Sequence, residues 1–115
     1  MNRTDPEQYL PLTPLAFEVL LAVADNSLHG YDIMLAVEQR TGGQLSPNPG
    51  TLYRVLDRLL NEGLLETDEQ ATGPEGEARR FYRLSKFGLR VADAEARRLD
   101  DQVKAARARR LLKRT

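Results

Sequence analysis

The chain has 115 residues, of which 17 are basic and 17 acidic, and it contains no cysteine and a single histidine, His29. This length favours one domain with a modest core, and the residue counts exclude disulfides, iron–sulfur clusters, cysteine or multi-histidine zinc sites and a triad with a second imidazole. The charge is divided, since residues 1–69 hold 4 basic and 11 acidic side chains whereas residues 70–115 hold 13 and 6, which is typical of a polyanion-binding protein or of a solvated basic arm.

The sequence carries no membrane or secretion signal. No apolar run reaches the roughly 20 residues that a membrane span needs. Residues 1–8 are polar and acidic, unlike a signal peptide. We therefore expect a cytoplasmic protein without a membrane partner, and we interpret residues 1–11 as an N-terminal arm.

The first helix is predicted to begin after Thr13, because threonine caps a helix and Pro14 fits its first turn. An apolar run continues to Ala24 with only Glu18 interrupting it, which predicts a helix buried on nearly all sides. A second helix is expected over residues 30–40, with two glycines ending it. Its inward residues are predicted to be Ile33, Met34 and Val37.

The third helix is predicted to begin after Asn48, which fits the cap position, with Pro49 in the first turn and Gly63 just beyond the end. One face carries apolar side chains at helical spacing, and the other carries charged and amide side chains. The apolar stripe is Leu52, Val55, Leu56, Leu59 and Leu60. The opposite face is Arg54, Asp57, Arg58 and Asn61.

The spacing of apolar residues along the sequence changes after the third helix. Residues 64–68 are short and extended, residues 71–76 have loop composition and residues 79–84 alternate, which together predict a two-stranded hairpin with a long tip. Ser85 is expected to cap a last helix over residues 86–112. This helix would be about 40 Å long, more than a domain of this size covers with its own core.

The last helix carries apolar residues at alternating steps of three and four, which is a heptad-like seam. Such a seam on an overlong helix predicts a homodimer, with the apolar first helix supplementing a thin interface. The alternative is a stripe that folds back on its own domain. The predicted interface residues are Leu15, Leu89, Ala92, Ala96, Leu99, Val103 and Ala106.

The order of helix, helix, helix, hairpin and long helix predicts a mostly α fold with a small β-hairpin. It is the order of a winged helix-turn-helix followed by a long C-terminal dimerisation helix. We assign residues 12–85 to the winged helix-turn-helix and residues 86–115 to the dimerisation helix with a basic tail.

The third helix is the one expected to enter the major groove of double-stranded DNA. At its start, Gly50 lets backbone N–H groups approach a phosphate, and the hydroxyls of Thr51 and Tyr53 can bond phosphate. Arg54 and Arg58 stand one turn apart, where an arginine can bind guanine bidentately. With the cap residue, the candidate DNA-binding residues of this helix are Asn48, Gly50, Thr51, Tyr53, Arg54 and Arg58.

These side chains also have ordinary structural interpretations. Tyr53 can pack against the helix flank, while Arg58 can pair with Glu62 and Arg54 with Asp57.

The hairpin and the C-terminus supply further basic residues. Arg79, Arg80 and Arg83 fall on the return strand, where they would contact phosphate or simply protect a solvated strand edge. The tip carries Glu75 and Glu77, so we expect the base of the wing rather than its tip to touch DNA. For residues 102–115, which carry no acid, direct DNA contact is not expected, since cations also favour the end of a helix dipole.

No enzyme site emerges from the sequence. His29 is interpreted as a structural hydrogen-bonding residue and Tyr31 as a core or capping residue. No pair of carboxylates stands where acid–base chemistry would be expected, so we expect neither catalysis nor a cofactor.

Four segments in this order resemble the PadR-type transcriptional regulators, of the short branch with a single C-terminal helix. They are LHGYDI (28–33), PGTLYRVLDRL (49–59), EGLL (62–65) and RFYRLSKFG (80–88), and the resemblance covers about residues 12–91. It implies a homodimeric winged-helix repressor of an inverted-repeat operator. Its first and last helices would build the dimer. By position, Gly50, Thr51, Tyr53 and Arg54 fall on the recognition helix and Arg79 and Arg80 on the wing.

The resemblance also implies that some members bind aromatic or drug-like effectors near the dimer interface. Certain short members place a tryptophan on the last helix to stack a flat ligand, but this chain has none and carries Ala96 there. A small hydrophobic or aromatic effector would be lined by Leu15, Phe17, Met34, Leu99 and Val103, which a packed interface explains equally well.

The leading hypothesis is therefore a homodimeric, sequence-specific transcriptional regulator. The alternative is a winged-helix protein-interaction module that does not read DNA, which the acidic N-terminal half and wing tip favour. An enzyme is a distant third.

Overall fold

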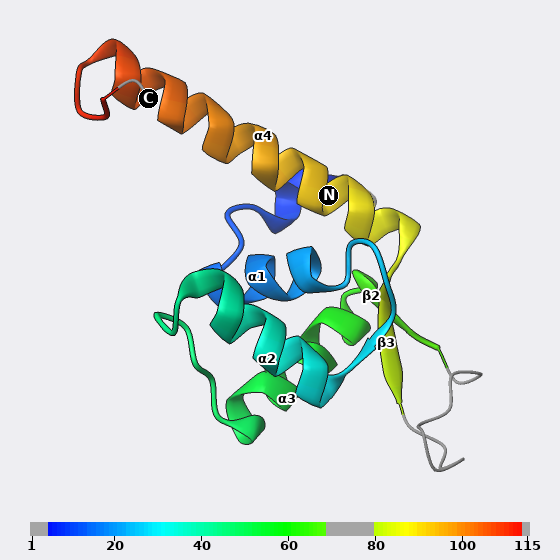
Figure 1. Cartoon of the computed structure of the whole chain (residues 1–115). Helices are drawn as coiled ribbons and strands as arrows, with labels where there is room; N and C mark the ends of the chain where they lie inside the picture. The colour runs from blue at the N-terminus through cyan, green and yellow to red at the C-terminus, as the bar shows by residue number, and fades with distance from the viewer. Residues whose placement is uncertain (1–4, 69–79, 114–115) are drawn as a thin grey trace.

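Four α-helices and a small antiparallel sheet form the part of the chain that the computed structural model describes, residues 5–68 and 80–113 (Figure 1). A 3-10 turn, η1, comes first and leads into the helices. In chain order the elements are η1 (Pro6–Tyr9), α1 (Pro14–Ala22), β1 (Leu28–His29), α2 (Gly30–Thr41), α3 (Pro49–Asn61), β2 (Leu65–Asp68), β3 (Phe81–Leu84) and α4 (Lys86–Ala108).

The three predicted caps begin their helices. The side-chain oxygens of Thr13, Asn48 and Ser85 each accept a backbone N–H three residues later, at 3.1, 2.8 and 2.8 Å. His29 does the same for α2, since its Nδ1 accepts the N–H of Asp32 at 3.4 Å, which confirms a structural role. Each bond satisfies a donor that a helix start otherwise leaves unpaired.

The core lies where α1, α2 and α3 meet the sheet. From the predicted apolar stripe of α3, Leu52, Leu56 and Leu59 are buried, while Val55 and Leu60 are half-buried against the same cluster. On α2, Ile33 and Val37 are buried and Met34 is half-buried. The α2 helix ends at Gly42, whose φ of 61° is the left-handed conformation that glycine adopts without strain.

The sheet has three strands, so the predicted two-stranded hairpin is incomplete. The strand order is β1-β3-β2, and β1 pairs antiparallel with β3 through Leu28 opposite Tyr82 and His29 opposite Phe81. A two-residue strand is too short to show any alternation in the sequence. It forms because β3 would otherwise leave one row of backbone groups unpaired.

Two helix ends and two burial predictions also need correction. The α1 helix ends at Ala22 and α4 at Ala108, short of the predicted Ala24 and Leu112. The α1 helix is not buried all round, since Leu21 is 41% exposed and lines the open cleft between α1 and α2. Tyr31 is 58% exposed, so it is not a core residue.

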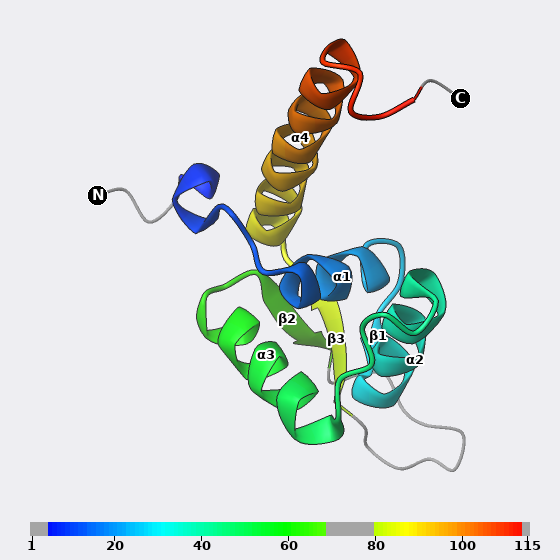
Figure 2. The same ribbon diagram turned by 90° about the vertical axis from the view of Figure 1, so that its left-hand side faces the viewer.

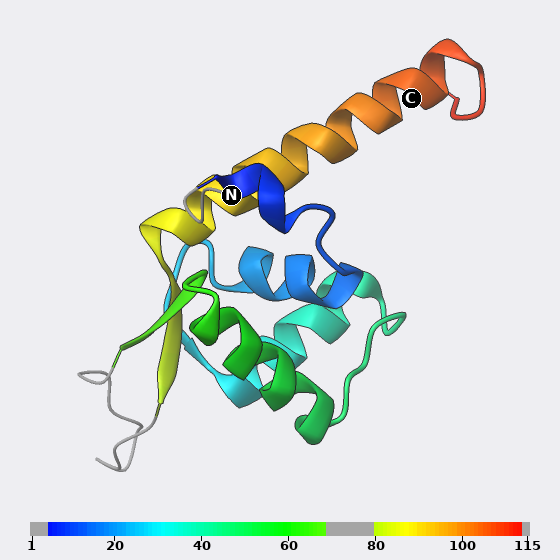
Figure 3. The same ribbon diagram turned by 180° about the vertical axis from the view of Figure 1, so that it is seen from behind.

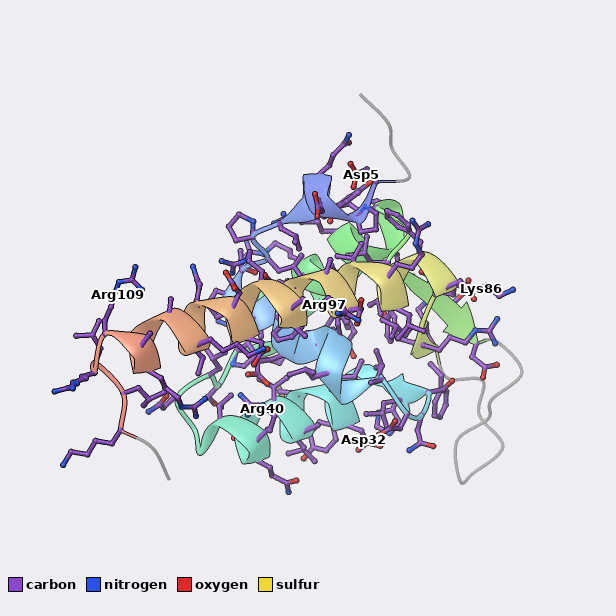
Figure 4. All side chains as sticks on the ribbon, turned by 90° about the horizontal axis from the view of Figure 1, so that it is seen from above. Asp5, Asp32, Arg40, Lys86, Arg97 and Arg109 are labelled. Atoms are coloured by element: carbon purple, nitrogen blue, oxygen red, sulfur yellow. The ribbon has the colours of Figure 1, made fainter. Side chains whose placement is uncertain are left out.

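The α4 helix runs across α1 and continues past it to a free end (Figures 1 and 4). Gly88, Val91 and Glu95 form its buried face. Leu89, Ala96 and Val103, from the predicted seam, are exposed, and they do not fold back on the domain. Ala92, Leu99 and Ala106 are half-buried.

The N-terminal arm is not free along its whole length. The η1 turn packs against the first half of α4, where the rings of Tyr9 and Phe87 meet edge to face at 5.4 Å. The N–H of Leu12 donates to Oε2 of Glu95 at 2.6 Å. Among the described helices, none is long and apolar enough to cross a membrane.

Candidate nucleic-acid interface

The start of α3 and the outer ends of β2 and β3 lie on the same side of the molecule, and α4 lies on the opposite side (Figures 2 and 3). The first turn of α3 is open to solvent, because Asn48, Pro49 and Gly50 are all exposed. Among the described elements, no other helix therefore blocks this end of α3. A helix end of this kind presents free N–H groups and a partial positive charge to an approaching anion.

The two candidate base-reading arginines lie on the exposed face of α3. Nη2 of Arg54 donates to Oγ1 of Thr51 at 3.5 Å, so this arginine leans toward the start of the helix. Nε of Arg58 stands 3.5 Å from Oε1 of Glu62, which is the predicted i,i+4 pair. That pair is long and solvated and contributes little, so Arg58 can exchange it for another acceptor.

The ring of Tyr53 lies over the first residue of α2. A Cβ on Gly30 would stand 2.5 Å from Oη of Tyr53 and 2.8 Å from its Cζ, so only glycine leaves room for the ring in this position. Tyr53 is nevertheless 45% exposed. The ring therefore packs against the start of α2 while nearly half of the residue stays exposed.

A shallow cleft joins α2, α3 and the base of the wing. Its lining residues are His29, Gly30, Tyr31, Tyr53, Arg80 and Tyr82. Burial raises the pKa of the Tyr82 phenol, and a hydrogen bond with Arg80 offsets part of that rise. The phenol is thus neutral at physiological pH, and it holds the exposed Arg80 beside Tyr53.

Of the remaining wing residues, one arginine forms an ion pair within the chain, and the others lie outside the described residues. Nε of Arg83 stands 3.0 Å from Oε2 of Glu66, directly across the sheet, so this arginine has a partner within the chain. Arg79, Glu75 and Glu77 lie outside the described residues.

His29 and its neighbours have local structural roles. Nε2 of His29 stands 3.0 Å from Oδ2 of Asp32, and its ring meets that of Phe81 edge to face at 5.5 Å. In the described ranges, no group of three or more metal-ligating side chains comes together.

Sequence reasoning missed the contributions of Gly30 and Tyr82 to this site. Both belong to motifs that carried the family resemblance. Gly30 is 23 positions from Tyr53, and no helical or strand period signals that contact. Tyr82 and Arg80 are two positions apart, a spacing that places side chains on one face of a strand and could have indicated their pairing.

Comparison with known proteins gives a consistent match. The family model described as "Transcriptional regulator PadR-like family" matches residues 19–94. The transcriptional regulator Rv3488 of Mycobacterium tuberculosis is 35% identical over 83 residues, which are 72% of this chain and 73% of that protein. The transcriptional regulator YqjI of Escherichia coli is 32% identical over 59 residues, 51% of this chain, and the match spans only 28% of YqjI.

Crystal structures show the same fold. A PadR-like transcriptional regulator from Bacillus cereus superposes with a TM-score of 0.71 and 18% identity, covering 87% of this chain and 93% of that one. PadR of Bacillus subtilis, in a structure described as a complex with operator DNA, gives a TM-score of 0.61 and 22% identity, covering 71% and 47%.

Proposed function

Because the chain belongs to the PadR-like family of transcriptional regulators, we propose that it is a homodimeric repressor that binds an inverted-repeat operator through α3 and the base of the wing. The observation that carries this proposal is the open N-terminal end of α3. It stands beside Arg80 and opposite α4, so a dimer formed through α4 leaves both reading surfaces free.

Within each half-site, the residues divide by chemistry. Arg54 and Arg58 supply the side chains that can reach base edges in the major groove. Gly50 brings a backbone N–H and Thr51 brings its hydroxyl to a phosphate. Asn48 keeps its amide nitrogen for the same purpose, while its oxygen caps α3 by accepting the N–H of Thr51. Tyr53 and Arg80 hold the next phosphate, at the cleft between α2, α3 and the wing. Arg79 is assigned to the same wing contact from its position in the sequence.

The dimer proposal is supported by the exposed stripe of α4. Leu89 is 59% exposed, and Ala96 and Val103 follow it at intervals of seven. An isologous interface brings the same surface of both copies together. Since the stripe is symmetric about Ala96, two antiparallel α4 helices would place each Leu89 against Val103 of the other copy. Leu15, on α1, is half-buried against the core and would extend this interface.

An effector site depends on the second copy. Phe17, Met34, Leu99 and Val103 come from α1, α2 and α4, and Met34 packs against the core of its own chain. The clefts along α4 and between α1 and α2 have other linings, among them Leu10 and Arg97 in the first and Leu21 and Arg40 in the second. We therefore keep the effector as a hypothesis about the assembled dimer.

The test is a selection of genomic DNA fragments with the purified protein at two salt concentrations. We expect recovery of one inverted-repeat sequence, with an affinity that falls steeply as salt rises. Arg54→Ala is expected to relax the preference at one base pair by roughly 1–3 kcal/mol.

Arg97→Ala is the matched control, because Arg97 is an exposed arginine on α4 that pairs with Asp93 at 2.9 Å. It should leave the selected sequence unchanged. Recovery of no fragment at low salt, or of all fragments alike, would contradict operator reading and would favour a protein-interaction module.

A further inference from the structure

The end of α3 and the start of α4 meet at one small contact, the α3–α4 joint, made of Gly63, Leu64, Ser85 and Gly88. The N–H of Ser85 donates to the carbonyl of Leu64 at 3.1 Å, and Oγ of Ser85 donates to the carbonyl of Gly63 at 2.6 Å. The same Oγ accepts the N–H of Gly88 at 2.8 Å. One buried hydroxyl therefore links the chain that ends α3 to the first turn of α4.

Gly88 is the closest point of the joint. A Cβ at this position would stand 2.0 Å from the carbonyl oxygen of Leu64 and 2.9 Å from its carbonyl carbon. Both are backbone atoms, so no side-chain rotation relieves the overlap. The φ of Gly88 is not positive. Glycine is therefore required here by the close approach of two backbones and not by an unusual conformation.

The Leu64 side of the joint is held firmly. The N–H of Leu64 donates to the carbonyl of Leu59 at 2.9 Å, and the N–H of Gly63 donates to that of Leu60 at 3.0 Å. These bonds close the end of α3, with Gly63 at a φ of 79°. Leu64 and Leu65 are buried. A larger residue at position 88 would therefore move α4 rather than Leu64.

Such a movement is amplified by the length of α4. Val91 contacts the core three residues from Gly88, and Glu95 holds the helix seven residues, or about two turns, from Gly88, while the free part continues to Ala108. Lifting the first turn by about 1 Å would tilt a helix held roughly 10 Å away, at Glu95, by several degrees. Because the two copies are related by one symmetry axis, the tilt would shift both α3 helices and change their separation by twice the shift of one. Successive base pairs are about 3.4 Å apart, so a change of a few ångströms in this separation corresponds to a different spacer.

We propose that Gly88 determines which spacing between operator half-sites the dimer accepts. It is a positioning residue that contacts no DNA and acts by fixing the direction of α4 relative to α3. This inference rests on the proposed function, because it assumes a dimer formed through α4.

The test uses a pool of synthetic inverted repeats that share the selected half-site and differ in spacer length by single base pairs. Wild-type protein is expected to enrich one spacer at least about tenfold over its neighbours. With any other spacer length, only one protomer of the dimer can contact its half-site, and the contacts of the other are lost. Gly88→Ala is expected to move this preference to another spacer or to reduce it to within about twofold. Its enrichment of an isolated half-site should stay within about twofold of wild type.

Lys86→Ala is the matched control. It truncates an exposed side chain in the same first turn of α4 and leaves the contacts of the joint in place, so it should keep the wild-type spacer. A folded, dimeric Gly88→Ala protein that keeps the wild-type spacer overturns the proposal.

Ser85→Ala is the second variant in case Gly88→Ala does not fold. It removes the hydroxyl bonds to Gly63 and Gly88 without adding bulk. Since the chain has no cysteine, a spin label at Asp57→Cys on the exposed face of α3 reports the distance between the two α3 helices of a dimer. We expect a shifted or broadened distance distribution in Ser85→Ala, and an unchanged one contradicts the proposal. If wild-type protein selects no operator, the proposed function fails, whereas this distance still tests the joint.

Discussion

At the residue scale, the candidate interface depends on a close contact that is possible only because Gly30 has no side chain. Gly30 leaves room for the ring of Tyr53, which lies over the start of α2 and beside Arg80. Gly30, for which no DNA contact is proposed, therefore positions the side chain of Tyr53. Arg54, in contrast, is oriented only by an exposed bond to Thr51, and DNA can reorient it freely.

Gly30→Ala is expected to weaken operator binding about fivefold to tenfold while changing the free energy of unfolding by less than about 1 kcal/mol. The added methyl displaces the end of a flexible ring rather than backbone. Binding is measured by titration with operator DNA, and unfolding by urea. Tyr53→Phe, which removes only the hydroxyl, supplies the comparison. In the double variant the two losses should not add, because both remove the same phosphate contact. Fully additive losses would show that Gly30 and Tyr53 act separately.

At the element scale, α4 is fastened to the rest of the chain at the α3–α4 joint and by Glu95. This carboxylate is 1% exposed, yet it has partners for both oxygens: Oε2 accepts the N–H of Leu12 at 2.6 Å and Oε1 pairs with Arg98. A buried carboxylate is tolerated only with such partners. Glu18 on α1 is a second example, because Arg40 of α2 binds both of its oxygens and the pKa of Arg40 is raised by this pairing.

Glu95→Ala is expected to lower the free energy of unfolding by about 2 kcal/mol, because it leaves the N–H of Leu12 without an acceptor inside the protein. Glu95→Gln should lose less, since its amide oxygen still accepts that bond. Urea denaturation measures both. The control is Asp93→Ala, which removes a solvated carboxylate two residues away and should leave stability almost unchanged. Equal losses of unfolding free energy for the two alanine variants would show that the contact between Glu95 and Leu12 does not stabilise the fold.

At the scale of the whole molecule, the proposed DNA-binding surface and the proposed dimerisation helix lie on opposite sides. The start of α3 and the base of the wing lie on one side, and α4 lies on the other (Figure 3). The exposed stripe of α4 is made of Leu89, Ala96 and Val103. The outer part of α4 extends beyond the three-helix core, where Val103 is 36% exposed. In the proposed dimer, this stripe is covered by the stripe of a second copy, which has the same spacing and length.

The register of the dimer is testable because the chain has no cysteine of its own. Under mild oxidation, Ala96→Cys is expected to form a covalent dimer, since a disulfide needs Cβ atoms about 4 Å apart. Leu89→Cys and Val103→Cys should remain unlinked separately and link when mixed. Gel electrophoresis without reductant measures this, and Arg97→Cys, off the stripe, should stay unlinked. Linking of all three single stripe variants would show a parallel pairing instead.

Much of the fold was predictable because its signals are local. Capping by Thr13, Asn48 and Ser85 and the apolar stripe of α3 were confirmed, since a cap or a period involves residues within one or two turns. The strand β1 and the exposure of Tyr31 were not predictable, because each depends on what packs beside it. Of the candidate site, the order of motifs placed α3 and the wing, and the contact between Gly30 and Tyr53 was missed.

The helix starts, the two-faced α3, the long last helix and the family resemblance follow from patterns within the amino-acid sequence. Which small and charged residues hold these elements together follows from their packing. Leu12 and Glu95 are 83 positions apart, and Gly88 touches Leu64 across the whole wing. Such contacts have no period and no preferred spacing, because they arise only when separately formed elements pack, so burial and close approach become visible only in three dimensions.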